Sequence, residues 1–149
     1  LALQRNFSAA EEVARELQQR LPDSALPPLL LGIALAGQGD DQTAQQQLDI
    51  AWQRAPGHPA IAARLAVLAL SHGDTAKAAD YYRQVLEQHP GHGATLKQLA
   101  MLASQRDDQQ QRLAYLQQYV SYHPLELKPR LLLAASLYTQ GQPQAAIEV

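Results

Sequence analysis

The chain has 149 residues, of which 46% are hydrophobic and 17% charged, a balance that is normal for one folded domain. Its 12 Lys and Arg against 14 Asp and Glu give a net charge of −2, which argues against nucleic-acid binding because that function needs a basic excess. The sequence has no cysteine, which excludes disulfides and thiol chemistry, and no apolar run in it is long enough to span a membrane.

A step of 34 residues runs through the sequence and sets the order of its predicted elements. Three series of residues share it: the prolines Pro22, Pro56, Pro90 and Pro124, the small residues Gly32, Ala66, Ala100 and Ala134, and the leucines Leu31, Leu65, Leu99 and Leu133. Several independent series with one period indicate a structural repeat.

Each repeat is expected to hold two helices, because apolar residues recur at helical spacing in two stretches between consecutive prolines. Leu1–Arg5 is predicted to be the tail of a first helix and Ser8–Leu21 its partner, which together end a first repeat over residues 1–24. Full repeats are expected over residues 25–58 and 59–92, a degenerate one over 93–126, and a truncated one over 127–149. We therefore expect residues 1–149 to be a fragment of a single longer array.

The two helices of a pair are predicted to turn at Gly39, Gly73 and Gly141, with Asp107 at the corresponding place of the degenerate repeat. Glycine suits the left-handed backbone that ends many helices, and Asp40 or Asp41 can then cap the next helix. The proline at the end of each repeat should stop the second helix, because it lacks an amide hydrogen and clashes with the preceding turn.

Small residues in the helices predict close packing. Gly32 costs roughly 1 kcal/mol relative to Ala in a helix interior, so we expect it to serve a helix contact. Ala44 and Ala78 are expected to do the same from the second helices. Arg112 stands at the corresponding place of the degenerate repeat, where it should either disturb that contact or make the second helix tilt to expose it.

These features resemble the tetratricopeptide repeat (TPR) over nearly the whole chain. The family pattern has Leu-Gly or Leu-Ala in the first helix. Its second helix has Ala, then an aromatic residue or Leu, then an apolar residue and finally Pro. One copy is matched by Leu31-Gly32, Ala44, Leu48, Ala51 and Pro56, and the next by Leu65-Ala66, Ala78, Tyr82, Val85 and Pro90. The resemblance implies an all-α fold, a right-handed α-solenoid of stacked antiparallel helix pairs (TPR superhelix).

Arrays that resemble this chain bind a protein or peptide partner in a concave groove lined by the first helices. The phase of the repeat gives the candidate groove residues Leu26, Leu29, Ile33, Ala63, Val67, Leu70, Lys97, Met101, Lys128, Leu131 and Tyr138. An apolar lining suits an apolar peptide, a partner helix or a self-contact. The alternative is that these residues only pack against neighbouring helices.

Charged ligands of the groove are a further possibility at the sequence level. The cations Arg64, Lys97, Lys128 and Arg130 could form a basic strip for an anionic ligand, although solvated surface charges are the favoured interpretation. Some family members clamp a peptide carboxylate with polar groove residues, but Leu29, Ile33, Ala63 and Val67 take those places here, and Lys97 alone approaches that pattern. A chaperone-tail clamp is therefore not expected.

The sequence predicts no catalytic residues, no cofactor and no metal site. It contains neither a phosphate-binding glycine-rich loop nor a hydrolase or zinc-protease motif. His58, His89, His92 and His123 fall in the loops between repeats, and ligands of one ion must approach it to about 2.0–2.1 Å. Neighbouring repeats stand roughly 10 Å apart, so these histidines are interpreted as turn residues.

The function expected from this pattern is a non-enzymatic scaffold. The phrases Leu31–Ala34, Leu65–Asp74 and Pro129–Ala134 resemble long TPR lipoproteins of bacterial exopolysaccharide and PEP-CTERM/exosortase systems. That resemblance implies a periplasmic or outer-membrane-anchored protein of a Gram-negative envelope. Two alternatives stay open: the substrate-selecting region of a larger glycosyltransferase or sulfotransferase, and a self-associating module that stacks through its ends.

Overall fold

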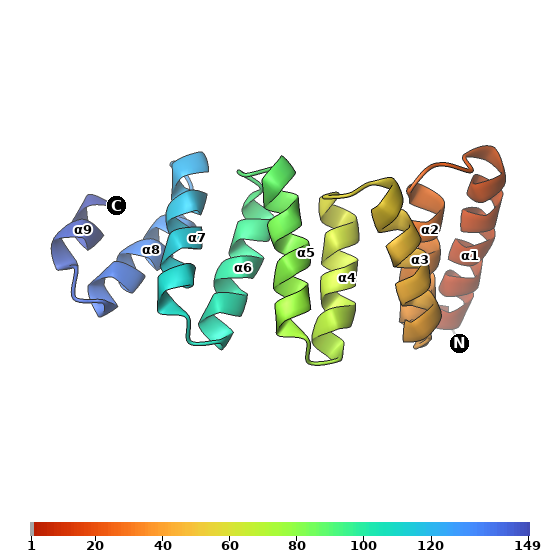
Figure 1. The fold of residues 1–149 in the computed structure, drawn as a ribbon, viewed down its shortest axis with the longest axis horizontal. Helices are drawn as coiled ribbons and strands as arrows, with labels where there is room; N and C mark the ends of the chain where they lie inside the picture. The colour runs from red at the N-terminus through yellow and green to blue at the C-terminus, as the bar shows by residue number, and fades with distance from the viewer. Residues whose placement is uncertain (1) are drawn as a thin grey trace. The chain divides into compact units, whose positions relative to one another are not determined.

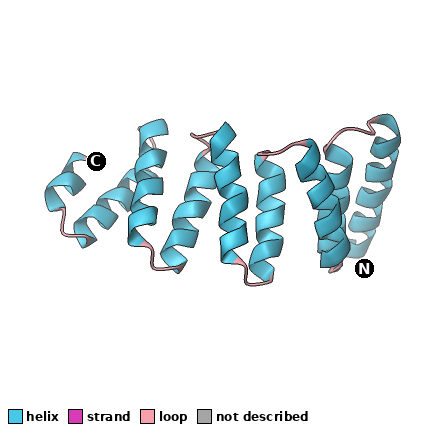
Figure 2. Cartoon of the chain, in the orientation of Figure 1, coloured by secondary structure: helices cyan, strands magenta, loops and turns pink. Residues whose placement is uncertain are grey.

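The computed structural model describes the backbone of residues 2–149 and the side chains of residues 9–149. Regular structure in this part of the chain is helical, and no strand occurs among residues 2–149 (Figure 1; Figure 2). The helices are α1 (Ala2–Arg20), α2 (Leu26–Gln38), α3 (Asp41–Arg54), α4 (Pro59–Ser71), α5 (Thr75–Gln88), α6 (Gly93–Gln105), α7 (Gln109–Tyr122), α8 (Leu127–Thr139) and α9 (Pro143–Glu148). The predicted all-α, solenoid class of fold is confirmed.

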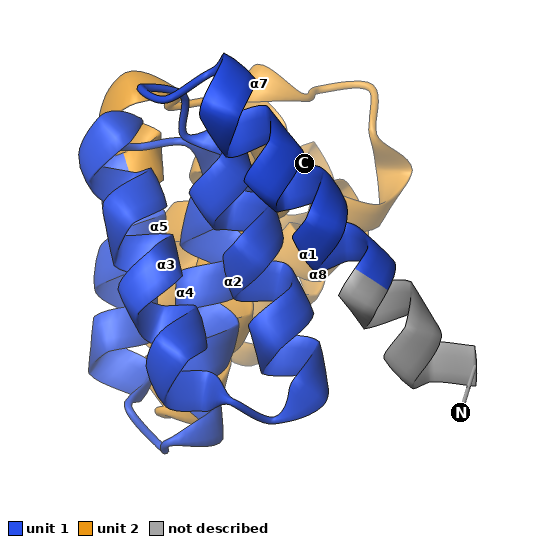
Figure 3. Ribbon diagram, turned by 90° about the vertical axis from the view of Figure 1, so that its right-hand side faces the viewer, with its two compact units in different colours: residues 1–84 blue, residues 85–149 orange. Residues whose placement is uncertain are grey.

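The chain divides into two compact units, residues 1–84 (unit 1) and residues 85–149 (unit 2), with the boundary inside α5 (Figure 3). In unit 1, α1 packs on α2, α2 on α3 and α3 on α4. In unit 2, α6 packs on α7, α7 on α8 and α8 on α9. Helices that follow one another in sequence therefore also pack together, as expected of a repeat array.

The N-terminal helix differs from the sequence prediction. A break was expected between Arg5 and Ser8, but α1 continues from Ala2 to Arg20. Arg5 stands 34 residues before Gly39, at the place where the other repeats have a residue of positive φ. The segment around Arg5 contains neither glycine nor proline, and the Ala, Leu, Gln, Glu and Arg that dominate α1 favour helix, so the helix continues.

The prolines that end the repeats also end helices, as predicted. Four helices stop two residues before such a proline: α1 at Arg20 before Pro22, α3 at Arg54 before Pro56, α5 at Gln88 before Pro90, and α7 at Tyr122 before Pro124. The proline ring disfavours helical backbone at the preceding residue, which explains the common distance.

The turns within the helix pairs use left-handed backbone. Gly39, Gly73 and Gly141 have φ values of 86°, 78° and 75°. Asp107 keeps the same turn without glycine, at φ 55°. Aspartate tolerates this conformation better than most residues, and the Asp107 carboxylate also accepts a hydrogen bond of 3.0 Å from the Gln109 side chain. The degenerate repeat therefore retains its turn.

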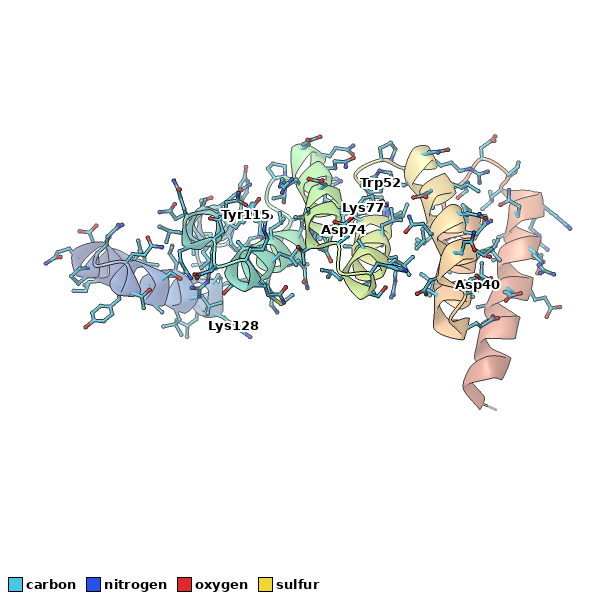
Figure 4. All side chains as sticks on the ribbon, turned by 60° about the horizontal axis from the view of Figure 1, so that its bottom comes forward. Asp40, Trp52, Asp74, Lys77, Tyr115 and Lys128 are labelled. Carbon is cyan, nitrogen blue, oxygen red and sulfur yellow. The ribbon has the colours of Figure 1, made fainter. Side chains whose placement is uncertain are left out.

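An aspartate follows each of the first three turns and caps the next helix, as predicted for Asp40. Its carboxylate accepts a hydrogen bond from the backbone amide three residues later; the pairs are Asp40 with Thr43 at 3.1 Å, Asp74 with Lys77 at 2.9 Å, and Asp108 with Gln111 at 3.0 Å. The hydrogen bonds from the Thr43 side chain and amide lower the pKa of Asp40. Figure 4 labels Asp40 and Asp74.

Close helix packing at Gly32 is confirmed. A Cβ atom on Gly32 would lie 2.6 Å from Cγ of Leu48 and 3.2 Å from the carbonyl oxygen of Ala44. Leu48 is 1% exposed, and Ala44 and Ala78 are fully buried. The small residues therefore let α2 and α3 approach until backbone and side chain are in contact.

Second helices of unit 1 also touch each other through aromatic side chains. Trp52 of α3 and Tyr81 of α5 meet edge to face, with ring centroids 5.7 Å apart. The ammonium group of Lys77 lies 6.0 Å from the centroid of Tyr81. These side chains, of which Trp52 and Lys77 are labelled in Figure 4, link consecutive helix pairs.

Gly32→Ala tests the close contact of α2 with α3. Overpacking against Leu48 costs about 1–3 kcal/mol, and better helix propensity returns about 1 kcal/mol, so we expect a net loss of unfolding free energy in urea denaturation. Gly37→Ala is the matched control, because Gly37 lies in the same helix but is exposed, and it should stabilise. Equal stabilisation by both substitutions would contradict the contact.

Asp107→Gly tests the backbone strain in the degenerate turn. Glycine adopts positive φ without a Cβ clash, so we expect a gain in stability of about 0.5–1 kcal/mol. The reverse exchange, Gly73→Asp, should cost about 1 kcal/mol in the same denaturation assay. A loss of stability in Asp107→Gly would mean that the carboxylate stabilises the turn more than the backbone strain opposes it.

Candidate functional site

The predicted groove residues lie at the surface of both units. All of them are half-exposed or exposed; they are Leu26, Leu29, Ile33, Ala63, Val67, Leu70, Lys97, Met101, Lys128, Leu131 and Tyr138. Val67 is 57% exposed and Met101 is 45% exposed, values that are high for side chains of their apolar character. Each unit gathers some of these residues around a hollow.

The hollow of unit 1 that holds predicted residues is a small apolar groove of about 240 Å³. It is lined by Gly32, Ile33, Ala36, Gly37, Leu48, Arg64, Val67 and Leu68, and we call it the unit-1 groove. Ile33 and Val67 are the predicted residues among them. Arg64 supplies the charge in this lining.

The hollow of unit 2 is a larger cleft of about 450 Å³ between α6, α7 and α8. Its lining consists of Lys97, Gln98, Ala100, Met101, Ser104, Arg112, Leu116, Tyr119, Glu126, Lys128, Pro129 and Leu132, and we call it the unit-2 cleft. Lys97, Met101 and Lys128 are the predicted residues among them. In Figure 4, Lys128 and the labelled Tyr115 of α7 lie on opposite sides of unit 2.

Other predicted residues lie outside both hollows. Leu26, Leu29, Ala63, Leu70, Leu131 and Tyr138 line neither the unit-1 groove nor the unit-2 cleft. At α8 the cleft is lined by Leu132 rather than by its neighbour Leu131. Since adjacent helical residues point about 100° apart, a shift of one position moves a side chain out of a site of this width.

The sequence analysis missed several side chains of the unit-2 cleft, some of them on the second helix. Leu116 and Tyr119 come from α7 and Glu126 from the loop before α8. In the sequence, the feature that could have pointed to the second helix was Arg112, because it replaces the alanine found at this position in the other repeats. The structure places its half-buried side chain in the wall of the cleft, where Ala44 and Ala78 are fully buried in their own repeats.

The carboxylate of the cleft is already engaged by neighbours. The Tyr119 hydroxyl donates a hydrogen bond of 3.1 Å to Glu126. When His123 is protonated it forms an ion pair with Glu126, with Nδ1 at 3.3 Å from the carboxylate. Burial, and then the hydrogen bond and charge of Glu126, raise the pKa of Tyr119.

The cations of the cleft have no comparable partner. Lys97, Arg112 and Lys128 form no ion pair with a carboxylate among residues 9–149. They come from three different helices, α6, α7 and α8, and they face one hollow. The unit-2 cleft thus carries positive charge that the described residues leave uncompensated.

Hydrogen bonds from α7 fix the aromatic end of the cleft. His123 Nε2 donates to the carbonyl of Gly91 at 2.7 Å, and the Gln118 side chain donates to the carbonyl of Pro90 at 2.9 Å. The His123 ring also contacts Tyr119 edge to face, with centroids 5.1 Å apart. The loop between α5 and α6 therefore holds the Tyr119 ring in place.

The loop histidines serve as helix-end residues. His92 is the N-cap of α6 and accepts a hydrogen bond from the amide of Thr95, while His123 is the C-cap of α7. Burial, and then the charge of His89, lower the pKa of His92. Among the described side chains, no group of three His, Cys, Asp or Glu is placed to hold a metal ion.

Comparison with known proteins agrees with this geometry. Residues 29–93 match the family described as "Tetratricopeptide repeat", and no curated protein sequence matches the chain. None of the helices in residues 2–149 has the length and apolar character that crossing a membrane requires.

Solved structures with the same fold include MamA 41-end from Desulfovibrio magneticus RS-1, at 22% identity and a TM-score of 0.64, over 99% of this chain and 89% of that one. They also include a tetratricopeptide repeat protein from Parabacteroides merdae, at 20% identity and a TM-score of 0.74. That match covers 95% of this chain and 58% of that one. A third is YrrB, titled "a TPR protein with an unusual peptide-binding site", at 15% identity and a TM-score of 0.70. That match covers 93% of this chain and 71% of that one. At these identities the likeness concerns the fold.

Gly91→Ala tests the packing of the loop that supports the cleft. An added Cβ would lie 2.6 Å from Cδ1 of Tyr122, so we expect a loss of about 1–3 kcal/mol in the unfolding free energy. The double variant Gly91→Ala with Tyr122→Ala should be about as stable as Tyr122→Ala alone. Additive losses in this cycle would show that Gly91 and Tyr122 do not press on each other.

Proposed function

We propose, from the tetratricopeptide repeats over residues 29–93 and the α-solenoid fold of the described chain, that this protein is a scaffold that holds a protein or peptide partner and performs no catalysis itself. The observation that carries the proposal is the exposure of apolar side chains around hollows on the first helices, α2, α4, α6 and α8. Apolar surface kept in water at a concave site is typical of interaction surfaces.

The two hollows support the proposal in different ways. In unit 1, Ile33 and Val67 come from consecutive first helices and line one groove with an apolar floor. In unit 2, Met101 and Leu132 do the same in a larger cleft. A segment with apolar side chains at regular spacing would remove these surfaces from water, which favours binding by about 25 cal/mol for each Å² buried.

The aspartates and histidines at the helix ends have structural roles, which is why we propose no catalytic step. Asp40 and Asp108 cap helices, and His92 and His123 stand at helix ends. Two solved structures with the same fold support this class of function. YrrB is titled as a protein with a peptide-binding site. Naa15/Naa10, solved bound to HypK, has a TM-score of 0.75 at 16% identity, and the match covers 97% of this chain and 23% of that one.

For the cellular setting we propose assembly of the envelope or export of exopolysaccharide in a Gram-negative bacterium. The phrases Leu31–Ala34, Leu65–Asp74 and Pro129–Ala134 support it. Deletion of the gene in the source bacterium should reduce secreted polysaccharide, and cell fractionation should find the protein in the envelope. A cytoplasmic protein with unchanged polysaccharide would reject this setting and leave the scaffold function in place.

Ile33→Glu tests the scaffold function. A carboxylate in the unit-1 groove should weaken partner capture by about tenfold or more, because it would be buried against apolar side chains. Partners cross-linked in the source organism would be identified, purified and titrated against each variant. Ile50→Glu is the matched control, since Ile50 is an exposed residue of α3 outside both hollows. Identical affinities of the two variants for every purified partner would reject the unit-1 groove as a contact.

A further inference from the structure

We propose that the unit-2 cleft binds an acidic segment of a partner protein, one in which carboxylate side chains alternate with apolar side chains. The proposal rests on the scaffold function and adds the chemistry of the partner. It follows from three observations: the charge of the cleft, the position of Arg112, and the apolar floor beneath the cations.

The charge of the unit-2 cleft calls for an anionic ligand. Lys97, Arg112 and Lys128 line it and make no ion pair within the described residues, whereas Glu126, its one carboxylate, accepts a hydrogen bond from the Tyr119 hydroxyl. Three cations around a hollow repel one another. A ligand with two or three carboxylates would relieve that repulsion and form charge-assisted hydrogen bonds, above all with the guanidinium of Arg112.

Arg112 is placed where a stable array would have a small residue. Ala44 and Ala78 occupy this position in the preceding repeats and are fully buried. Arginine is much larger than alanine, and its half-buried side chain stands in the wall of the cleft. An arginine at this position therefore supplies the cleft with a partly desolvated charge, which strengthens an ion pair with a ligand.

The floor of the cleft distinguishes a polypeptide from other anions. Met101, Leu116 and Leu132 line the same cleft as the cations, together with Ala100 and Pro129. A phosphate ion or an acidic polysaccharide offers nothing to cover this apolar surface. A peptide with Leu or Phe between its Asp or Glu residues fills the floor and reaches the cations at once.

The unit-1 groove provides an internal comparison. It is also lined largely by apolar side chains of first helices, but Arg64 is the only charged residue in its lining. Acidic and neutral apolar peptides should therefore differ in affinity for unit 2 and differ much less for unit 1. This contrast separates the chemistry of the cleft from general stickiness of the solenoid.

The test uses the whole chain and three labelled probes in fluorescence anisotropy. The first probe is a short peptide of alternating Glu and Leu with both termini blocked, so that no terminal carboxylate contributes. The second has Gln in place of Glu, and the third is oligogalacturonate of equal charge. We expect the Glu–Leu peptide to bind about tenfold or more tightly than either of the others, and to weaken as salt is raised.

Variants assign the binding to the cleft. Arg112→Gln keeps the bulk of the side chain and removes its charge, so it should weaken the Glu–Leu peptide about tenfold, whereas Arg112→Lys should restore part of the affinity. Lys97→Gln should weaken it to a smaller extent. Lys77→Gln is the matched control, because Lys77 is a cation of unit 1 outside both hollows, and it should bind as the unmodified chain does. Circular dichroism would confirm that each variant is folded.

The outcomes keep this proposal apart from the scaffold function. Equal affinity for the Glu–Leu and Gln–Leu peptides, tighter binding of oligogalacturonate, or an unchanged Arg112→Gln variant would each overturn the acidic partner. Binding of the Gln–Leu peptide that is lost in Ile33→Glu would then still support a scaffold. The scaffold function itself would be rejected if purified cellular partners bound Ile33→Glu, Arg112→Gln and the unmodified chain with equal affinity.

Discussion

The structure depends on close contact between helices that cannot bury their apolar faces alone. A pair of amphipathic helices leaves one face of each uncovered, and this face becomes a core only when the next pair stacks on it. Gly32 lets α2 approach until a Cβ atom would meet Leu48 at 2.6 Å, and Ala44 and Ala78 leave no exposed surface. Small side chains at two positions of the regular repeats, one in each helix of the pair, thus decide how closely neighbouring helices approach.

The stops between helices are the second requirement, because stacking needs helices of equal length in the same phase. Proline ends the second helix two residues ahead of it, and a residue of positive φ ends the first. Asp107 shows that the turn depends on the backbone conformation rather than on glycine itself. Where neither signal is present, around Arg5, the helix continues and no pair forms.

These rules also explain how much the sequence could predict. Period, proline and turn residues are local, so helix ends such as Arg54 before Pro56 follow from sequence alone. The face of a first helix on which a residue lies also follows from the period, and Ile33, Val67 and Met101 of the predicted set line the hollows. A cleft is different, because its shape depends on side chains of three helices at once. Glu126 and Tyr119 could not be assigned to it from spacing along one helix.

The departures from the repeat pattern lie close together, and this bears on function. Asp107 and Arg112 both break a rule that the other repeats keep, five residues apart, in the pair that borders the unit-2 cleft. A strained turn and a charge at a packing position each lower stability, and natural sequences tolerate such conflicts chiefly where a site requires them. Arg112 lines one hollow together with Lys97 and Lys128, so the residue that departs from the packing pattern of the other repeats also contributes charge to the cleft.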